Sequence, residues 1–147
     1  MISAKTAAVS THSVSTVVRG ADPGSIGRAR EAARTFADSL VPAMDRTAAD
    51  SLVLVVSELV TNALRHGGGH YALALSATED TVTVEVGDRS PALPRERAPD
   101  LNGGSGGFGW HMVRRLTTGL SVIRGPGAGK TVRARIPRAP GTGPGAG

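Results

Sequence analysis

The sequence predicts an α+β fold in which helices lie on one face of a mixed, mostly antiparallel sheet. Two segments in the first half, residues 26–40 and 45–66, carry apolar residues at helical spacing. Alternation of apolar and polar residues, which is typical of strands, occurs once before these helices and in two pairs after them. The chain has 147 residues, which fits one domain. Because Phe, Trp and Tyr make up only 3% of the residues, the core must be built from aliphatic side chains.

The first strand is expected over residues 13–19 (SVSTVVR), followed by a turn that caps the first helix. That helix is amphipathic, and its apolar face consists of Ala29, Ala33, Phe36 and Leu40. The second helix ends at three consecutive glycines, residues 67–69, which are a common C-terminal cap. Residues 71–77 and 81–87 then alternate as two strands around a short turn.

A segment rich in proline and glycine, residues 89–106, comes next and is long for a connection inside a compact domain. Its length predicts a lid or a binding loop. A third helix is expected over residues 110–116, and strands over residues 120–123 and 131–136. The polar first 13 residues and the Pro/Gly-rich residues 138–147 are expected to be disordered, which leaves residues 14–137 as the folded domain.

The formal net charge of +5 is unevenly distributed along the chain. Residues 1–100 hold ten Lys/Arg against twelve Asp/Glu, whereas residues 101–147 hold seven Lys/Arg and no acid. This asymmetry indicates either a polyanionic partner or a codon bias that favours arginine. The absence of cysteine excludes disulfides and thiolate metal sites, and no apolar run has the length of a membrane span. We therefore expect a cytoplasmic protein that does not act at a membrane.

Polar residues form a stripe along the end of the second helix. Glu58, Asn62 and Arg65 are spaced so that they share one side of the helix, and His66 follows directly. The opposite side is apolar and sufficient to anchor the helix, through Leu52, Val56, Leu59, Val60 and Ala63. A solvated helix face would explain the stripe, but three other unusual features follow it: an acid at a strand end (Asp88), a glycine-rich segment, and a Gly-Lys-Thr turn.

Taken in order, four segments resemble the motifs of the Bergerat-fold ATPases, the superfamily of gyrase, heat-shock chaperone, histidine-kinase and mismatch-repair ATPases. SELVTNALRHG is similar to the N-box, VEVGDRSP to the first glycine box, GGFGWHMV to the second, and GAGKTVRARIP to the terminal threonine box. The resemblance covers residues 14–137. It is strongest to the small bacterial branch that contains anti-sigma-factor serine/threonine kinases and their actinobacterial relatives. It implies a two-layer sandwich that binds ATP and Mg²⁺.

Three residues would do most of the chemistry that this resemblance implies. Asn62 offers Mg²⁺ an uncharged oxygen ligand, and Mg²⁺ usually takes only one or two protein ligands beside phosphates. Glu58, one turn earlier, suits a general base that activates a water or a hydroxyl for attack on the γ-phosphate. Asp88 would accept the 6-amino hydrogen of adenine, although a loop-capping role is the alternative. Six further residues are expected to line the nucleotide site: His66, Gly107, Phe108, Gly109, Lys130 and Thr131.

These six residues have different expected roles. The glycines would let backbone N–H groups approach the phosphates where the third helix begins. Lys130 is expected at a phosphate, with a turn lysine in solvent as the alternative, and Thr131 is expected beside Asp88 or the adenine. His66 either lines the site or contacts the C-terminal carbonyls of its own helix. The sequence departs from the family at Ser90, where a glycine is usual, and at Phe108 and Trp110, which replace smaller or aliphatic residues.

The implied partners are a sigma factor and an anti-anti-sigma protein, the latter phosphorylated on Ser or Thr, with a homodimer as a further expectation. Two other hypotheses stay open. One is a catalytically inactive domain of the same fold that only docks proteins. The other is a basic nucleic-acid-binding module, which the lack of aromatics among the C-terminal arginines disfavours. A Walker P-loop at residues 125–131 is excluded by its spacing, since three residues separate Gly125 from Gly129 where the motif needs four.

Overall fold

The computed structural model describes residues 15–90, 106–125, 127 and 129–139, with the side chains of residues 106–108 left out. The two ends predicted to be disordered therefore lie almost entirely outside the described residues, as do residues 91–105 of the predicted lid. The described elements, in chain order, are β1 (Ser15–Gly20), α2 (Ser25–Ser39), α3 (Arg46–His66), β2 (Tyr71–Ala77), β3 (Thr81–Asp88), α4 (Gly106–Leu116), β4 (Gly119–Arg124) and β5 (Lys130–Pro137).

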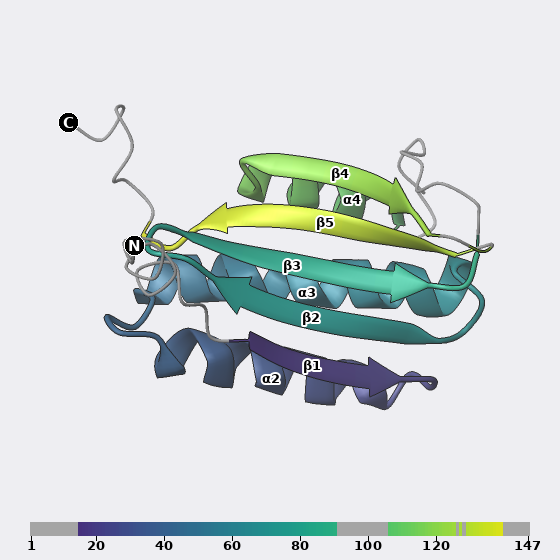
Figure 1. Cartoon of the computed structure of the whole chain (residues 1–147), viewed down its shortest axis with the longest axis horizontal. Helices are drawn as coiled ribbons and strands as arrows, with labels where there is room; N and C mark the ends of the chain where they lie inside the picture. Colours follow the sequence, from purple (N-terminus) through teal and green to yellow (C-terminus); the bar gives the residue numbers. More distant parts are fainter. Residues whose placement is uncertain (1–14, 91–105, 126, 128, 140–147) are drawn as a thin grey trace, which may run out of the picture.

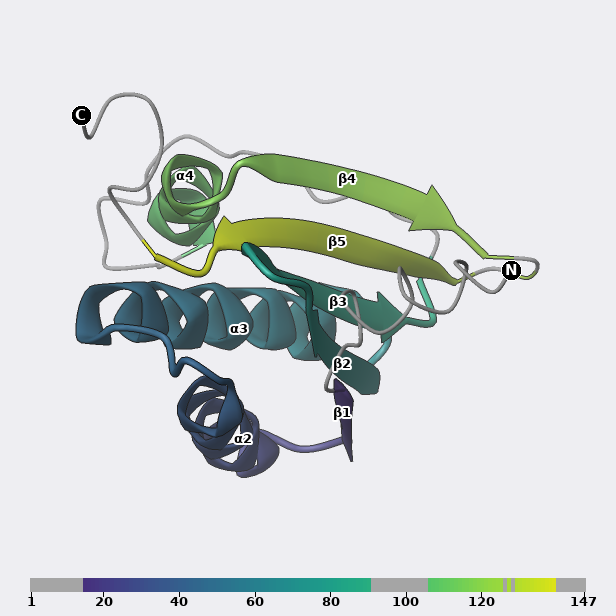
Figure 2. The ribbon, with the colours of Figure 1, turned by 60° about the vertical axis from the view of Figure 1, so that its left-hand side comes forward.

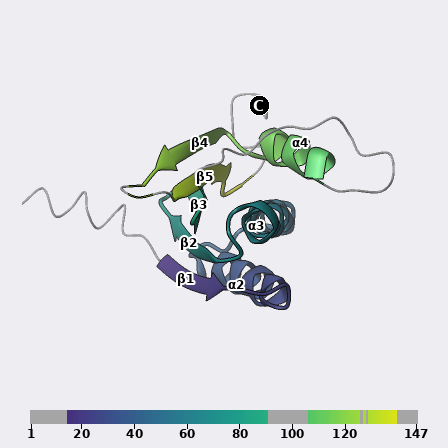
Figure 3. The ribbon, with the colours of Figure 1, turned by 90° about the vertical axis from the view of Figure 1, so that its right-hand side faces the viewer.

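Five strands form one sheet in the order β1-β2-β3-β5-β4, and every described pairing is antiparallel. The three helices lie side by side on one face of this sheet (Figures 1 and 2). The end-on view in Figure 3 shows the two layers, with the strands on one side and α2, α3 and α4 on the other. The predicted α+β class is confirmed, and the sheet is antiparallel throughout its described part rather than mixed.

Both long helices form where the apolar periodicity predicts them; α3 begins at a side-chain cap, and α2 begins after a hydrogen-bonded turn. Asp45 caps α3, because its Oδ1 accepts a hydrogen bond of 2.9 Å from the backbone N–H of Ala48. The turn before α2 is held by Asp22, whose Oδ1 accepts from the N–H of Ser25 at 3.0 Å. The predicted apolar face of α2 is buried, including Ala29, Ala33 and Phe36.

The central helix α3 supplies much of the core. Its predicted anchoring residues are all buried against the strands, namely Leu52, Val56, Leu59, Val60 and Ala63. By length and composition alone α3 could cross a membrane, but half of its apolar stretch is buried inside the fold, as in the core helix of a globular domain. From β2 and β3, alternate residues meet it: Leu73, Leu75, Val82, Val84 and Val86. The strand period of two thus places one aliphatic set against the helices.

The opposite face of the sheet, here called the open face, is not covered by any element in the described part of the chain (Figure 3). Small side chains such as Ala72 and Ala74 of β2 point to it. Val17 of β1, on the same face, is 57% exposed. Arg133 and Glu85 form a cross-strand ion pair there, with 2.6 Å between Nε and Oε2.

Element boundaries agree with the predictions to within a residue or two, except at α4. This helix begins at Gly106, whereas the sequence predicted a start near Trp110. Glycine disfavours helix interiors, so the glycine-rich sequence favours a loop at these positions. In the structure these residues form the first helical turn, which brings the second glycine box onto the helix itself.

Candidate functional site

The polar stripe of α3 lies where the helix meets two other elements, α4 and the end of β3. Glu58 and Asn62 are half-buried, whereas Arg65 and His66 in the last turn are exposed. The stripe is therefore not a uniformly solvated helix face. Its first two members lie under neighbouring structure, and its last two reach solvent.

Glu58 lies directly against the first turn of α4. A Cβ atom added to Gly109 would overlap Oε1 of Glu58, so only glycine leaves room for the carboxylate in this position. Burial raises the pKa of Glu58 above its ordinary value, and the positive charge of Arg65 partly opposes that shift. A raised pKa brings a carboxyl group closer to the range in which a general base works well.

The first turn of α4 offers backbone donors beside that carboxylate. The first four N–H groups of a helix have no partner within the helix, and here they belong to residues 106–109. The helix dipole adds a partial positive charge at the same end. Gly109 is buried and Trp110 is 8% exposed, so this turn is fixed against the core. The arrangement of donors suits an anion such as a phosphate.

Asp88 is the last residue of β3 and lies beside the C-terminal end of α3. Its carboxylate lies over Gly67, where an added Cβ would come within 2.5 Å of Oδ2. The backbone N–H of Arg89 donates to the carbonyl of Gly67 at 3.0 Å, and this bond joins the strand end to the cap of α3. Oδ1 of Asp88 also accepts from the N–H of Ser90 at 2.9 Å, which is the loop-capping contact weighed from the sequence.

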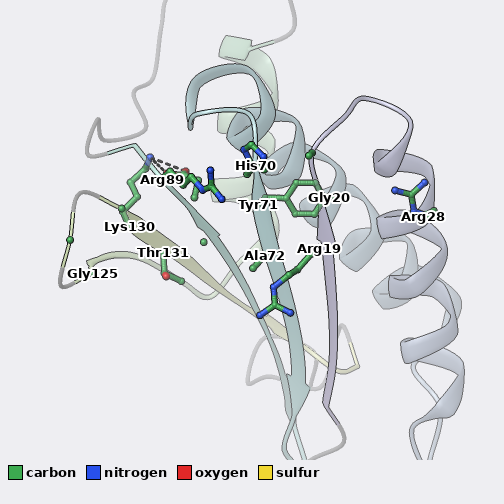
Figure 4. Close-up of a pocket in the computed structure, with 15 residues that line it drawn as sticks. Arg19, Gly20, Arg28, His70, Tyr71, Ala72, Arg89, Gly125, Lys130 and Thr131 are labelled. Atoms are coloured by element: carbon green, nitrogen blue, oxygen red, sulfur yellow. Dashed lines mark hydrogen bonds and ion pairs between the residues drawn. The ribbon is translucent and has the colours of Figure 1, made fainter.

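The main partner of Asp88 is Lys130, the first residue of β5. Its Nζ donates to Oδ1 at 3.0 Å and to Oδ2 at 2.9 Å, drawn as dashed lines in Figure 4, and to the carbonyl of Ser90 at 3.2 Å. Both side chains are only 5% exposed. The sequence predicted Lys130 at a phosphate and did not pair it with Asp88. Knowledge of the strand register would have predicted this pair, because Asp88 and Lys130 are direct cross-strand partners on the helix side of the sheet.

Thr131 lies on the opposite side of the sheet from this ion pair. It is the cross-strand partner of Gly87, and a Cβ on Gly87 would come within 3.4 Å of its hydroxyl oxygen. The structure therefore places Thr131 on the open face and Asp88 on the helix face. Of the other predicted site residues, His66 is exposed at the end of α3, and the side chain of Phe108 lies outside the description.

The described residues bring Glu58, Asn62, Gly109 and Asp88 around the C-terminal half of α3. In the part of the chain that the structure describes, no group of three or more His, Asp or Glu side chains could hold a metal ion by itself. A site for Mg²⁺ with one protein ligand needs no such group, since water and phosphate oxygens complete the coordination. Asn62, which is half-buried and one turn from Glu58, fits this need for one protein ligand through its amide oxygen.

Several solved structures share the fold, including the following two. One contains the RsbU and RsbW domains of Rv1364c from Mycobacterium tuberculosis, with a TM-score of 0.61 and 18% identity over 84% of this chain. The present chain spans only 32% of that longer protein. The other is the SiaB-SiaC complex from Pseudomonas aeruginosa, with a TM-score of 0.57 and 14% identity, covering 93% of this chain and 97% of the matched one.

No curated protein sequence matches the chain. A family profile does match, and it covers residues 20–136, which include the α3 stripe, Asp88, the first turn of α4 and all of β5 except its last residue. The extent of this match agrees with the resemblance found from the four sequence motifs. The chain belongs to the family of histidine kinase-like ATPase domains.

Proposed function

We propose that this protein binds Mg-ATP and acts as a regulatory serine/threonine kinase of the anti-sigma-factor type. The observation that carries the proposal is the position of Glu58, which lies against Gly109 in the first turn of α4. A carboxylate with a raised pKa thereby stands next to backbone N–H groups that suit a phosphate. Phosphoryl transfer depends mainly on this kind of positioning and electrostatic stabilisation.

Each residue of the stripe has a separate role in this proposal. Asn62 holds the metal, which in turn supplies charge neutralisation at the phosphates. Glu58 orients and deprotonates the attacking hydroxyl. The first turn of α4 donates N–H groups to the phosphate oxygens, and the positive end of the helix stabilises their charge.

Asp88 can serve the adenine without losing Lys130. A carboxylate oxygen accepts about two hydrogen bonds, and Oδ2 of Asp88 receives one, from Lys130, among the described contacts. The remaining lone pair is available to the 6-amino group of adenine. Lys130 would then act as the fixed counter-charge of the acceptor rather than as a phosphate ligand.

The proposed partner is a sigma factor or an anti-anti-sigma protein, in a cytoplasmic pathway that regulates transcription. One of the structures with a similar fold was solved as a complex of two proteins, which supports a protein partner. Family membership supports ATP as the phosphate donor. A homodimer stays a prediction from the resemblance.

Calorimetry with ATP, in the presence and absence of Mg²⁺, tests the binding step. Asn62→Ala should lower Mg-ATP affinity by about tenfold or more, equal to about 1.4 kcal/mol, and should have a much smaller effect without Mg²⁺. Thr35→Ala, an exposed substitution on α2, is the control and should not change either value. Equal Mg-ATP affinity in wild type and Asn62→Ala would remove Asn62 from the site.

Asp88→Asn tests base recognition separately. The amide has the size of the carboxylate but loses a charge-assisted acceptor, so ATP affinity should fall by about 1–3 kcal/mol. The change also weakens the buried pair with Lys130, so circular dichroism first verifies that the variant is folded. Tripolyphosphate lacks a base, and its binding should not change in the same way. If Asp88→Asn binds ATP as tightly as wild type does, Asp88 does not recognise the base and serves only as a loop cap and as the partner of Lys130.

Glu58→Gln separates binding from catalysis. The variant should bind Mg-ATP as wild type does and should lose about 10²–10⁴-fold in phosphotransfer to a partner protein. If wild type binds ATP but transfers no phosphate to proteins captured from the native cell, the inactive docking module becomes the better description.

A further inference from the structure

A cavity lies at one end of the sheet, and neither Glu58 nor Asn62 of the α3 stripe belongs to its lining. It has a volume of about 680 Å³ and is bounded by β1, the N-terminal part of α2, the start of β2, the end of β3 and the turn before β5. Cavities of this size are typical of small-molecule sites. Figure 4 shows Tyr71 in the middle of this site, with Arg28 on one side of it and Arg89 on the other.

The lining of this cavity, here called the basic pocket, is strongly cationic. Arg19, Arg28 and Arg89 contribute guanidinium groups from three separate elements, and His70 lies among them. In the described part of the chain, none of these three arginines forms an ion pair with a carboxylate. Asp88 is the one acid among the described residues of the lining, and Lys130 already neutralises it.

The wall between Arg19 and Arg28 is fixed by hydrogen bonds. The hydroxyl of buried Tyr71 donates to the carbonyl of Ser25 at 3.2 Å and lies 3.0 Å from its Oγ. Gly20 permits this close approach, because a Cβ there would overlap both Ser25 and the Tyr71 hydroxyl. Ser25 is fully buried, and its hydroxyl donates to the carbonyl of Asp22 at 2.7 Å. These hydrogen bonds therefore hold in place the turn that connects β1, which carries Arg19, to α2, which carries Arg28.

Small residues leave the floor of the basic pocket empty. Ala72 of β2 and Gly87 of β3 are cross-strand partners, and both lie on the open face of the sheet. A larger side chain at either position would occupy the space between Arg19 and Thr131. The described residues of the far rim are the glycines at 125, 127 and 129, which carry no side chain.

We propose that the basic pocket binds a small polyphosphate anion, with its phosphates held by Arg19, Arg28 and Arg89. Guanidinium groups match phosphate oxygens in bidentate geometry, and three of them around one cavity favour an anion that carries several phosphates. The arginines surround one concavity instead of forming a stripe, which favours a compact ligand over an extended nucleic-acid backbone.

This site goes beyond the proposed kinase function. It borders the Asp88–Lys130 pair, but its three arginines come from β1, α2 and the residue after β3, whereas the proposed phosphate donors for ATP lie in the first turn of α4. The two sites can therefore be tested independently.

The test is calorimetry with tripolyphosphate in EDTA, so that no divalent metal supports binding at Asn62. The variant Arg19→Gln/Arg28→Gln should lower the affinity at least about tenfold, since two of three charge-assisted contacts are lost. The control is Arg30→Gln/Arg46→Gln, which removes the same charge from exposed residues outside the pocket and should stay within about twofold of wild type. All four arginines are exposed, and circular dichroism verifies folding.

Amide chemical shifts locate the anion. Tripolyphosphate should perturb Ala72, Gly87 and Thr131 more than Gly107 and Gly109. The proposal is overturned if both double variants lose affinity equally, if the shifts are confined to the first turn of α4, or if a poly-glutamate peptide binds and tripolyphosphate does not. Loss of ATP binding in Asn62→Ala with unchanged tripolyphosphate binding would support the independence of the basic pocket.

Discussion

Lys130 and Asp88 form a buried cross-strand ion pair at the end of the sheet, with Nζ 2.9 and 3.0 Å from the two carboxylate oxygens. The third hydrogen of the ammonium group donates to the carbonyl of Ser90. The pair thus joins β5, β3 and the segment that follows β3 at one point.

Removing one member of this pair should destabilise the fold strongly. Lys130→Met leaves a carboxylate that is 5% exposed without its cation, so the free energy of unfolding should fall by about 3–5 kcal/mol at neutral pH. Urea denaturation measures the loss. In Lys130→Met/Asp88→Asn most of the stability should return, because no uncompensated charge is then buried.

The Arg133–Glu85 pair provides the matched control. It is also a cross-strand pair between β3 and β5, but its side chains are 35% and 34% exposed. Arg133→Met should therefore cost less than about 1 kcal/mol. If Lys130→Met costs no more than Arg133→Met, Lys130 does not anchor Asp88 in solution.

Gly109→Ala should displace the Glu58 carboxylate while leaving the fold intact. An added Cβ meets the flexible end of Glu58, and alanine is about 1 kcal/mol better than glycine in a helix, so the net stability change should be within about 1 kcal/mol. Phosphotransfer should fall nearly as far as in Glu58→Gln. In the Glu58→Ala background, Gly109→Ala should raise stability. A double-mutant cycle in which the effects of the two substitutions on stability simply add would contradict the contact between Glu58 and Gly109.

The stability of the protein should carry a pH-dependent contribution from Glu58. Burial raises the pKa of Glu58 in the folded state, so the folded state retains a proton that the unfolded state has already lost. This stabilisation is complete below the unfolded pKa, near 4.5, and is lost as the pH rises through the folded value. Glu58→Gln should therefore gain stability relative to wild type as the pH rises through that window. Thermal unfolding from pH 4 to pH 8 measures it, with Glu79→Gln in an exposed turn as a control that should gain nothing.

Two glycines should respond oppositely to alanine. Gly27, in α2, has open space where a Cβ would lie, so Gly27→Ala should stabilise by about 0.5–1 kcal/mol. At Gly67 the Cβ would come within 2.7 Å of the backbone oxygen of Ala63 and 2.5 Å of Asp88 Oδ2, so Gly67→Ala should destabilise by about 1–3 kcal/mol. Stabilisation by Gly67→Ala would mean that the end of α3 does not lie against Asp88.

The sequence by itself determined the fold class and most element positions. The bounds of β2 agree exactly with the prediction, and the buried faces of α2 and α3 are the predicted ones. These features depend on the spacing of apolar residues within one element, which can be read along the chain without knowing the partners. The four motifs likewise identified the family that the profile match confirms. The start of α4 escaped prediction because glycine propensity argues against a helix that tertiary contacts stabilise.

The tertiary structure alone decided which side chains meet. Asp88 and Lys130 are 42 residues apart, and their pairing depends on the register between β3 and β5, which no local pattern fixes. Glu58 meets Gly109 only because α3 and α4 pack side by side on the sheet. The basic pocket likewise needs β1, α2 and the end of β3 to converge, although each of its arginines looks like an ordinary surface charge in the sequence. Contacts between distant residues are set by the packing of whole elements, so their chemistry emerges only when the chain is folded.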